Sequence, residues 1–263
     1  MARFTLLSVL FALLLPAFLA VGLLGQATTA DPLSRAMQNP NDDNTITEVM
    51  HSYAHSKDPQ VISRLSELFR SISDHRLLRN FGMFMWTVVG RRDELYFNVL
   101  AGYAREAVTS DAPLPYFLDP DGNAIRQSTA PVAFSNWCQA RRLDPGACLT
   151  AAGEQTMDVW VLALLKDRRA IPILRQGLNA QNDALAGRAV AGLGMLNDAD
   201  SIPLIEAAIH RFRPKQQELI ASELAQFDDP RVGPLLDEFI KDPKWRQQLD
   251  DDIRKRHAEA AKK

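Results

Sequence analysis

The sequence is poor in the residues and motifs that mark several specialised classes of protein. It has only 2 cysteines, 13 glycines and 15 prolines in 263 residues, which excludes a disulfide-rich scaffold and a collagen-like or low-complexity chain. Its 30 basic and 32 acidic residues leave a net charge of −2, without the basic excess typical of nucleic-acid-binding proteins. No G-x-S-x-G, phosphate-loop, C-x-x-C or H-E-x-x-H motif is present. We therefore expect no catalytic residue, no cofactor and no nucleic-acid partner.

Apolar residues are concentrated at the N-terminus. Residues 1–30 hold 21 apolar side chains and a single charge, at Arg3, and they end in small residues. This arrangement is typical of a secretory signal peptide and predicts cleavage after Ala30, with cleavage after Ala27 as the other choice. The apolar run over residues 4–24 is also about as long as the roughly 20 residues that span a bilayer, so an uncleaved membrane anchor is the alternative. We expect a periplasmic or secreted protein that contacts the membrane only if this segment is retained.

Export would place the two cysteines in an oxidising compartment. Cys138 and Cys148 are separated by a short stretch that includes the turn-forming residues Pro145 and Gly146. The two thiols can therefore form a disulfide that closes a small loop. Two buried free thiols are the alternative, and neither cysteine lies in a local catalytic motif.

The strongest pattern in the sequence is a repeat of 31 residues. Pro172, Pro203 and Pro234 are spaced by this interval, and the apolar residues around them align without gaps. Each unit predicts two helices, because apolar residues recur at i, i+3 and i+7 in the first and at i, i+4 and i+7 in the second. Paired helices that repeat at this interval predict an all-α solenoid of antiparallel helix pairs.

Residues 183–206 carry the clearest unit, which reads Asp-Ala-Leu-Ala-Gly-Arg-Ala-Val-Ala-Gly-Leu-Gly-Met-Leu-Asn-Asp-Ala-Asp-Ser-Ile-Pro-Leu-Ile-Glu. This unit resembles the HEAT-repeat family, and in particular the short HEAT-like repeats of the phycobilisome-lyase type, with Arg188 before an alanine-rich core. The resemblance extends over about residues 153–242 and implies a HEAT-like or armadillo-type fold. It transfers no catalytic residue, because HEAT-like deoxyhypusine hydroxylase uses His-Glu iron motifs and this chain has no His-Glu dipeptide.

The rest of the chain is related to the repeat but irregular. A divergent unit begins at Asp58-Pro59, which matches the Asp229-Pro230 pair of the last repeat. The segment around Pro120-Asp121-Gly122 predicts a small β-hairpin, followed by a short helix that contains Trp137. We expect a signal peptide over 1–30, a flexible leader over 31–45, divergent N-terminal helical repeats over 46–108, an irregular insertion over 109–152, HEAT-like repeats over 153–242, and a polar capping helix and tail over 243–263.

Few residues are spaced in a way that would bind a metal ion. His51 and His55 are four residues apart on a predicted helix and can place two imidazoles on one metal, with Glu48 as a conceivable third ligand. Without a further ligand nearby, an exposed polar helix face is the simpler interpretation. His75, His210 and His257 are isolated in the sequence and are expected to be solvated.

The segment from Asp119 to Asn123 resembles the start of a calcium loop. Its glycine, however, is at the fourth position of the loop rather than the sixth, and Ala130 takes the place of the usual glutamate. The turn accounts for these residues without a bound ion.

The patterns together favour binding over catalysis. We expect an exported, non-catalytic binding or scaffold protein that presents a helical-repeat surface to a protein or peptide partner. One alternative is a small-ligand or metal-dependent enzyme or carrier that uses the aromatic insertion near Tyr116 and Trp137 with His51 and His55. Another is a membrane-anchored envelope assembly factor. Surface positions of the second helices are predicted to differ between units, as in Gly187 and Glu218, Ala191 and Ser222, and Met195 and Gln226.

Overall fold

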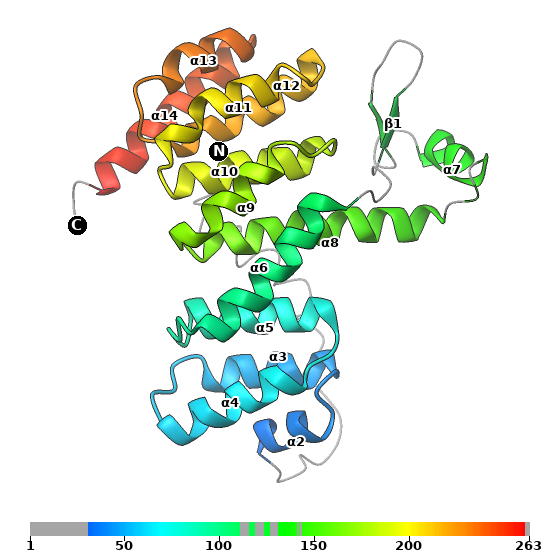
Figure 1. The fold of residues 1–263 in the computed structure, drawn as a ribbon, viewed down its shortest axis with the longest axis vertical. Helices are drawn as coiled ribbons and strands as arrows, with labels where there is room; N and C mark the ends of the chain where they lie inside the picture. Colours follow the sequence, from blue (N-terminus) through cyan, green and yellow to red (C-terminus); the bar gives the residue numbers. More distant parts are fainter. Residues whose placement is uncertain are drawn as a thin grey trace.

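The protein is helical over almost all of the chain that the structure, a computed structural model, describes (Figure 1). The described residues are 31–110, 116–118, 124–126, 131–140, 142 and 144–260. The all-α class predicted from the sequence is confirmed for these residues, among which one short antiparallel strand pair also occurs. The elements are α2 (Pro32–Gln38), α3 (Asp43–Tyr53), α4 (Pro59–Ser71), α5 (His75–Thr87), α6 (Glu94–Thr109), β1 (Tyr116–Leu118), β2 (Ala124–Arg126), α7 (Pro131–Ala140), α8 (Pro145–Leu164), η2 (Arg168–Ala170), α9 (Ile171–Gly177), α10 (Asp183–Met195), η3 (Ala199–Ser201), α11 (Ile202–Ile209), α12 (Pro214–Ser222), η4 (Glu223–Gln226), α13 (Val232–Phe239) and α14 (Pro243–Ala260).

Aspartate-proline pairs begin several of the helices. The Asp31 carboxylate accepts a hydrogen bond from the backbone N–H of Ser34 at 3.1 Å, and Asp58 caps α4 in the same way. These bonds satisfy backbone donors that have no partner inside the helix. Pro32 and Pro59 follow in the first helical turn, where proline costs no hydrogen bond. The local sequence therefore determines where these helices start.

Residues 31–45 do not form the flexible leader that the sequence predicts. Helix α2 packs against α3 and α4, and its Leu33 and Ala36 are fully buried. The Tyr53 hydroxyl donates a hydrogen bond to Asp31, and Arg64 Nη1 lies 3.3 Å from the same carboxylate. The prediction was wrong because the polar run after residue 38 obscured two apolar residues three apart, which give α2 its buried face.

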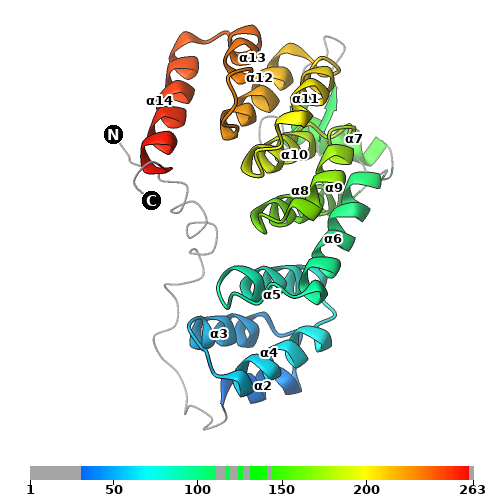
Figure 2. The same ribbon diagram turned by 60° about the vertical axis from the view of Figure 1, so that its left-hand side comes forward.

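The helices lie side by side in a curved array (Figure 2). Helices α5, α8 and α10 lie on the inner side of the curve, and α6, α9 and α11 lie on the outer side. Helix α12 and η4 pack against α10, and α14 packs against η4. We call α5, α8, α10 and α12–η4 the inner row. Helix α7 and the strands lie at the N-terminal end of α8 (Figure 1).

The turns that lead into α9 and α11 have the same local geometry. Lys166 and Asn197, 31 residues apart, both have positive φ, at 52° and 48°. A short 3-10 turn follows each of them, and then a helix with Pro172 or Pro203 in its first turn. The Asn197 side chain also accepts a hydrogen bond from the backbone N–H of Asp228 at 3.3 Å. The 31-residue interval of the sequence therefore corresponds to a recurring turn at these two places.

Helix α10 is enclosed on nearly all sides, and glycines allow its neighbours to come close. A Cβ atom added at Gly192 would lie 2.7 Å from Cβ of Ala163 on α8. A Cβ added at Gly194 would lie 2.6 Å from Cβ of Gln226 in η4. Both separations are shorter than side-chain carbons adopt, so these two positions require glycine if α8 and η4 keep their places.

Two positions that the sequence places on the surface of α10 are in fact buried. Gly187 and Ala191 are covered, and a Cβ at Gly187 would lie 3.9 Å from Cγ of Glu223. Of the three α10 positions predicted to lie on the surface, only Met195 is partly exposed. The prediction was wrong because a neighbouring helix can cover a small residue, and the local sequence does not show whether one does.

Aromatic side chains fill the core of the N-terminal half. Phe69, Phe81 and Tyr96 are at most 2% exposed, and the rings of Phe69 and Tyr96 meet edge to face with centroids 4.8 Å apart. Trp86 is also buried, and its indole N–H donates a hydrogen bond to the carbonyl of Leu165 at 3.0 Å. The aromatic side chains of α4 to α6 therefore serve largely as core packing.

Candidate functional site: the exposed face of the inner row

Apolar side chains remain half-exposed along one face of α8. Met157, Trp160 and Leu164 are each partly accessible to solvent. They follow the i, i+3, i+7 spacing and therefore lie on one side of the helix. Val161 and Leu162, between them in sequence, are buried. Helix α8 thus has one face in the core and a second apolar face that no described element fully covers.

The same face continues on α10 and α12. Arg188 and Leu219 follow Met157 at successive 31-residue intervals, and both are accessible, with Leu219 50% exposed. Met195 follows Leu164 at the same interval and is half-exposed. Equivalent positions on three successive helices are thus accessible to solvent. We call this set of residues the inner face, and it consists of Met157, Trp160, Leu164, Arg188, Met195, Leu219, Glu223 and Gln226.

Arg188 connects three helices of the inner face. Its guanidinium lies over the Trp160 ring, 4.6 Å from the centroid, and its Nη1 is 4.0 Å from Oε1 of Glu223. Burial raises the pKa of the Glu223 carboxyl, and the positive charge of Arg188 opposes this change. Tryptophan, methionine and arginine are enriched at the centres of protein interfaces, where they give large contact areas. The inner face therefore has the composition of a protein-binding surface.

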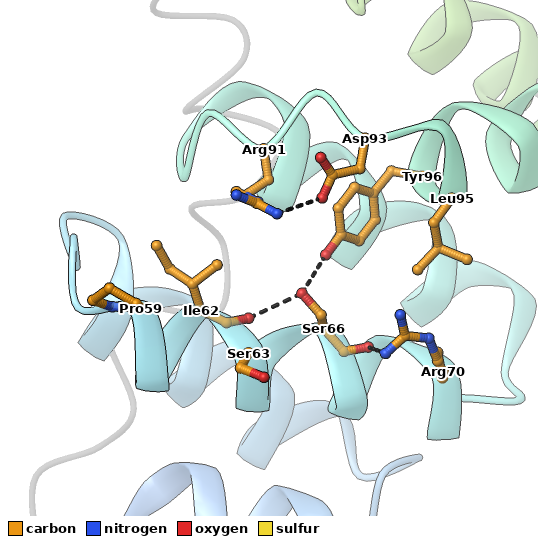
Figure 3. Close-up of a pocket in the computed structure, with 9 residues that line it drawn as sticks. All are labelled: Pro59, Ile62, Ser63, Ser66, Arg70, Arg91, Asp93, Leu95 and Tyr96. Atoms are coloured by element: carbon orange, nitrogen blue, oxygen red, sulfur yellow. Dashed lines mark hydrogen bonds and ion pairs between the residues drawn. The ribbon is translucent and has the colours of Figure 1, made fainter.

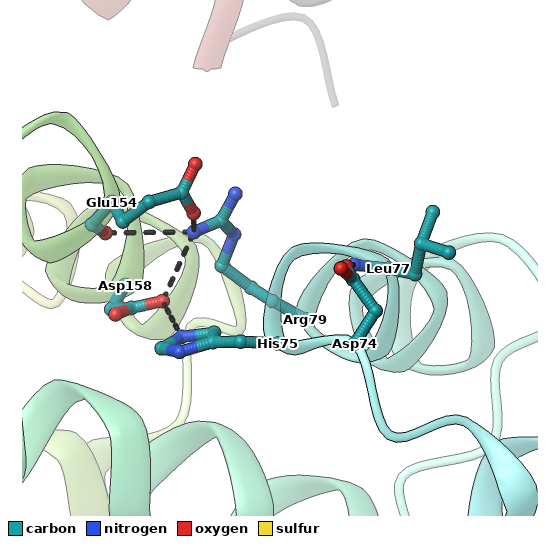
Figure 4. A network of polar contacts seen from close by, with 6 residues as sticks. All are labelled: Asp74, His75, Leu77, Arg79, Glu154 and Asp158. Atoms are coloured by element: carbon teal, nitrogen blue, oxygen red, sulfur yellow. Dashed lines mark hydrogen bonds and ion pairs between the residues drawn. The ribbon is translucent and has the colours of Figure 1, made fainter. Parts of the chain in front are cut away.

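A buried polar network joins α5 to α8 in the same row (Figure 4). Asp158 is 3% exposed, and its Oδ1 lies 3.0 Å from Nε2 of His75 and 3.2 Å from Nη1 of Arg79. Arg79 also pairs with Glu154, and the His75 ring stacks on Tyr103 with centroids 3.8 Å apart. Burial raises the pKa of the Asp158 carboxyl, while hydrogen bonding and charge from His75 and Arg79 lower it. Because Asp158 is engaged by both groups, we interpret the network as a junction between the two halves of the chain.

A hollow of about 490 Å³ lies between α4 and the start of α6 (Figure 3). The hydroxyls of Ser66 and Tyr96 are hydrogen-bonded at 2.8 Å, and Arg91 Nη2 lies 2.9 Å from Oδ2 of Asp93. Burial raises the pKa of Tyr96, while its hydrogen bond with Ser66 lowers it. These polar groups satisfy one another, so the hollow is less suited to specify a ligand than the inner face is.

The predicted histidine pair does not form a three-ligand site among the described residues. His51 lies near the end of α3, and His55 lies in the turn after it, exposed to solvent. Glu48, the conceivable third ligand, pairs with Arg35. The metal interpretation of this pair therefore gains no support from the described part of the structure.

Three side chains of types that can ligate a metal ion, Glu206, His210 and Glu238, lie together instead, with one potential ligand atom from each within 4.8 Å of the others. The sequence prediction treated His210 as isolated. The four-residue spacing of Glu206 and His210 was a signal that could have drawn attention to it. Glu238 lies 28 residues beyond His210 and joins the group only through tertiary structure.

Other predicted features lie partly or wholly outside the described residues. The signal segment 1–30 with Ala30 and the loop containing Asp119, Asp121 and Asn123 lie outside them. Cys138 is buried in α7, but the side chain of Cys148 is outside the described set, so their disulfide stays a prediction. The Tyr116 side chain is likewise outside it. Trp137 is partly buried beside Phe134, with ring centroids 6.3 Å apart.

The chain shows neither a membrane-spanning helix in its described part nor a match to known proteins. No helix in the described part of the chain has both the length and the apolar character needed to cross a membrane. No family model matches the chain, and no curated protein or solved structure matches it. The functional interpretation therefore rests on the chain's own residues and geometry.

Proposed function

We propose that this chain is an exported, non-catalytic binding or scaffold protein that holds a protein or peptide partner against its inner face. Its helices would form a HEAT-like α-solenoid of antiparallel pairs, with β1, β2 and α7 as an insertion. The observation that carries this proposal is the half-exposed stripe of methionine, tryptophan, leucine and arginine side chains on three successive inner helices.

The shape and composition of the inner face support a macromolecular partner. Helical-repeat proteins bind through extended concave surfaces, and α8 and α10, which carry much of the inner face, lie on the inner side of the curved array (Figure 2). Trp160 and Arg188 provide a stacked aromatic and cationic centre. Met157 and Met195 flank it with flexible side chains that adapt to the shape of a partner. An extended or helical segment of the partner would lie across α8, α10 and α12 in succession.

The cap of α2 is compatible with cleavage after Ala30. Cleavage there would leave Asp31 as the first residue. Asp31 caps α2 and accepts hydrogen bonds from Ser34 and Tyr53. A mature protein that begins at this residue would keep α2 complete. N-terminal sequencing of the protein recovered from producing cells distinguishes it from the uncleaved, membrane-anchored alternative.

Site-specific photo-crosslinking in producing cells tests the binding proposal. A photoreactive residue in place of Met195 is expected to crosslink one discrete protein. The same residue in place of Leu204, which is 50% exposed on the outer helix α11, is expected not to do so. Addition of Trp160→Ala and Arg188→Ala should abolish the Met195 crosslink while the circular dichroism spectrum is retained.

Two results would contradict the proposal. One is the same set of crosslinked products at Met195 and Leu204, which would mean that the inner face is not selective. The other is a Met195 crosslink that survives both Trp160→Ala and Arg188→Ala, because these two residues form the centre of the proposed surface.

A further inference from the structure

A second site lies on α11 and α13, outside the inner row. Glu206 is in α11, His210 caps its C-terminal end, and Glu238 comes from α13. Nε2 of His210 is 3.5 Å from Oε1 of Glu238, and the three ligand atoms lie within 4.8 Å of one another. In a tetrahedral zinc site with bonds of about 2.0–2.2 Å, neighbouring ligand atoms are about 3.3–3.6 Å apart. The His210–Glu238 pair already has this separation. A rotation of the flexible Glu206 side chain would bring its carboxylate to a similar distance from both.

The surroundings of His210 orient its ring and favour a cation. The ring meets Phe239 edge to face, with centroids 5.1 Å apart and planes at 63°. His210 lies at the C-terminal end of α11, where backbone carbonyls with no helical partner attract positive charge. The adjacent cation, Arg211, donates a hydrogen bond to the carbonyl of Leu178, so its guanidinium is engaged at the end of α9.

We propose that Glu206, His210 and Glu238 bind one divalent zinc ion that ties α11 to α13, with water as the fourth ligand. One imidazole and two carboxylates are ligands that zinc accepts, whereas magnesium and calcium prefer sites made only of oxygen atoms. Glu206 is half-exposed and the other two ligands are exposed, so an ion enters from solvent without disturbing the core. The ion would replace the 3.5 Å contact between His210 and Glu238 with bonds that span two helices.

The chain contains a matched histidine-carboxylate pair that serves as a control. His257 Nε2 lies 2.6 Å from Oδ1 of Asp228, and the His257 side chain is 53% exposed, close to the 52% of His210. Within the described residues, however, this pair is not part of a three-ligand group. The control pair thus lacks the second carboxylate, and its Asp228 also lies 3.9 Å from Nε of Arg256.

Isothermal titration of the purified protein, free of any affinity tag, with zinc chloride tests the proposal. We expect one equivalent of zinc to bind. His210→Gln and Glu238→Gln should each weaken binding by at least about tenfold, since loss of even an outer-shell partner of a metal ligand costs roughly 10–100-fold. His257→Gln should leave binding unchanged. Cobalt should show visible absorption typical of a four-coordinate ion in the wild type and lose it in His210→Gln.

Thermal unfolding provides a second measurement that does not depend on calorimetry. Zinc should raise the unfolding temperature of the wild type and of His257→Gln, but not that of His210→Gln. The proposal is overturned if zinc fails to bind at micromolar concentration, if His210→Gln retains wild-type affinity, or if His51→Gln abolishes binding instead. These outcomes are independent of the inner face, because neither Trp160 nor Arg188 takes part in the zinc site.

Discussion

The helices before the insertion and those after it build their cores in different ways. In α4 to α6 the core contains large aromatic side chains such as Phe69, Phe81 and Tyr96. In α8 to α13 it is largely aliphatic, and the glycines of α10 bring neighbouring helices close. Large rings fill the space between helices at several spacings, whereas small residues work only at one. The aliphatic core thus accompanies the regular 31-residue repeat, and the aromatic core accompanies the irregular part of the sequence.

The two halves also differ in their polar anchors. All four tyrosines of the chain lie between residues 53 and 116. Tyr53 holds the α2 cap at Asp31, and Tyr96 is hydrogen-bonded to Ser66. Arginine–carboxylate pairs occur in both halves, such as Arg64 with Asp31 at 3.3 Å and Arg175 with Asp198 at 2.8 Å, so the tyrosine hydroxyls are what distinguishes the N-terminal half. We therefore expect the halves to respond differently to substitution and to pH.

The largest effect should come from emptying the aromatic core. Phe81→Ala removes a fully buried ring and is expected to lower the free energy of unfolding by about 3–5 kcal/mol, because the remaining side chains cannot fill the cavity. Leu204→Ala, at a half-exposed position of the other half, should change it by only about 0.5 kcal/mol. Urea unfolding measures both. Equal effects would show that Phe81 is not a core residue.

Glycine substitutions should have opposite signs in the two halves. Gly192→Ala places a methyl group against Ala163 and Leu174 and should destabilise the protein by about 1–3 kcal/mol. Gly102→Ala, within α6, meets nothing within 4 Å and should stabilise it by about 0.4–1 kcal/mol through better helix propensity. Urea unfolding of the two variants compares them. A stabilising Gly192→Ala would contradict the close approach of α8 and α10.

A smaller loss of stability is expected at alkaline pH, and it should begin in the N-terminal half. Burial, together with the hydrogen bond to Asp31, raises the pKa of Tyr53 to about 12. Because this value exceeds the usual pKa near 10, the contribution of Tyr53 to stability is complete below about pH 10 and is lost as pH rises through 12. Unfolding temperatures measured between about pH 9 and 12 should fall more steeply for the wild type than for Tyr53→Phe. Parallel curves would contradict this assignment.

The sequence predicted most of the helices because their signals are local. Aspartate-proline caps and apolar spacing located α4, α10 and α14 to within a few residues. The same reasoning missed α2, whose buried Leu33 and Ala36 lie next to a long polar run. It also named Gly187 and Ala191 as surface, because burial there depends on η4 and α8 rather than on α10 itself.

The candidate sites were predicted less well than the helices. Trp160 and Met157 were not distinguished from core residues, because both lie in an apolar stretch whose second exposed face is visible only after α8 is packed. The predicted pair His51 and His55 gained no third ligand among the described residues, whereas His210 gained Glu238.

The sequence by itself determined where the helices begin and which apolar side chains share a face, since caps and periodicity involve residues only three or four positions apart. Only the tertiary structure decided which faces stay open and which distant groups meet. It left Met157, Trp160 and Leu164 of α8 partly exposed while covering Gly187 and Ala191 of α10, and it brought Glu238 to His210 and Asp158 to His75. Contacts between residues tens of positions apart depend on how whole helices pack, and no local pattern records that.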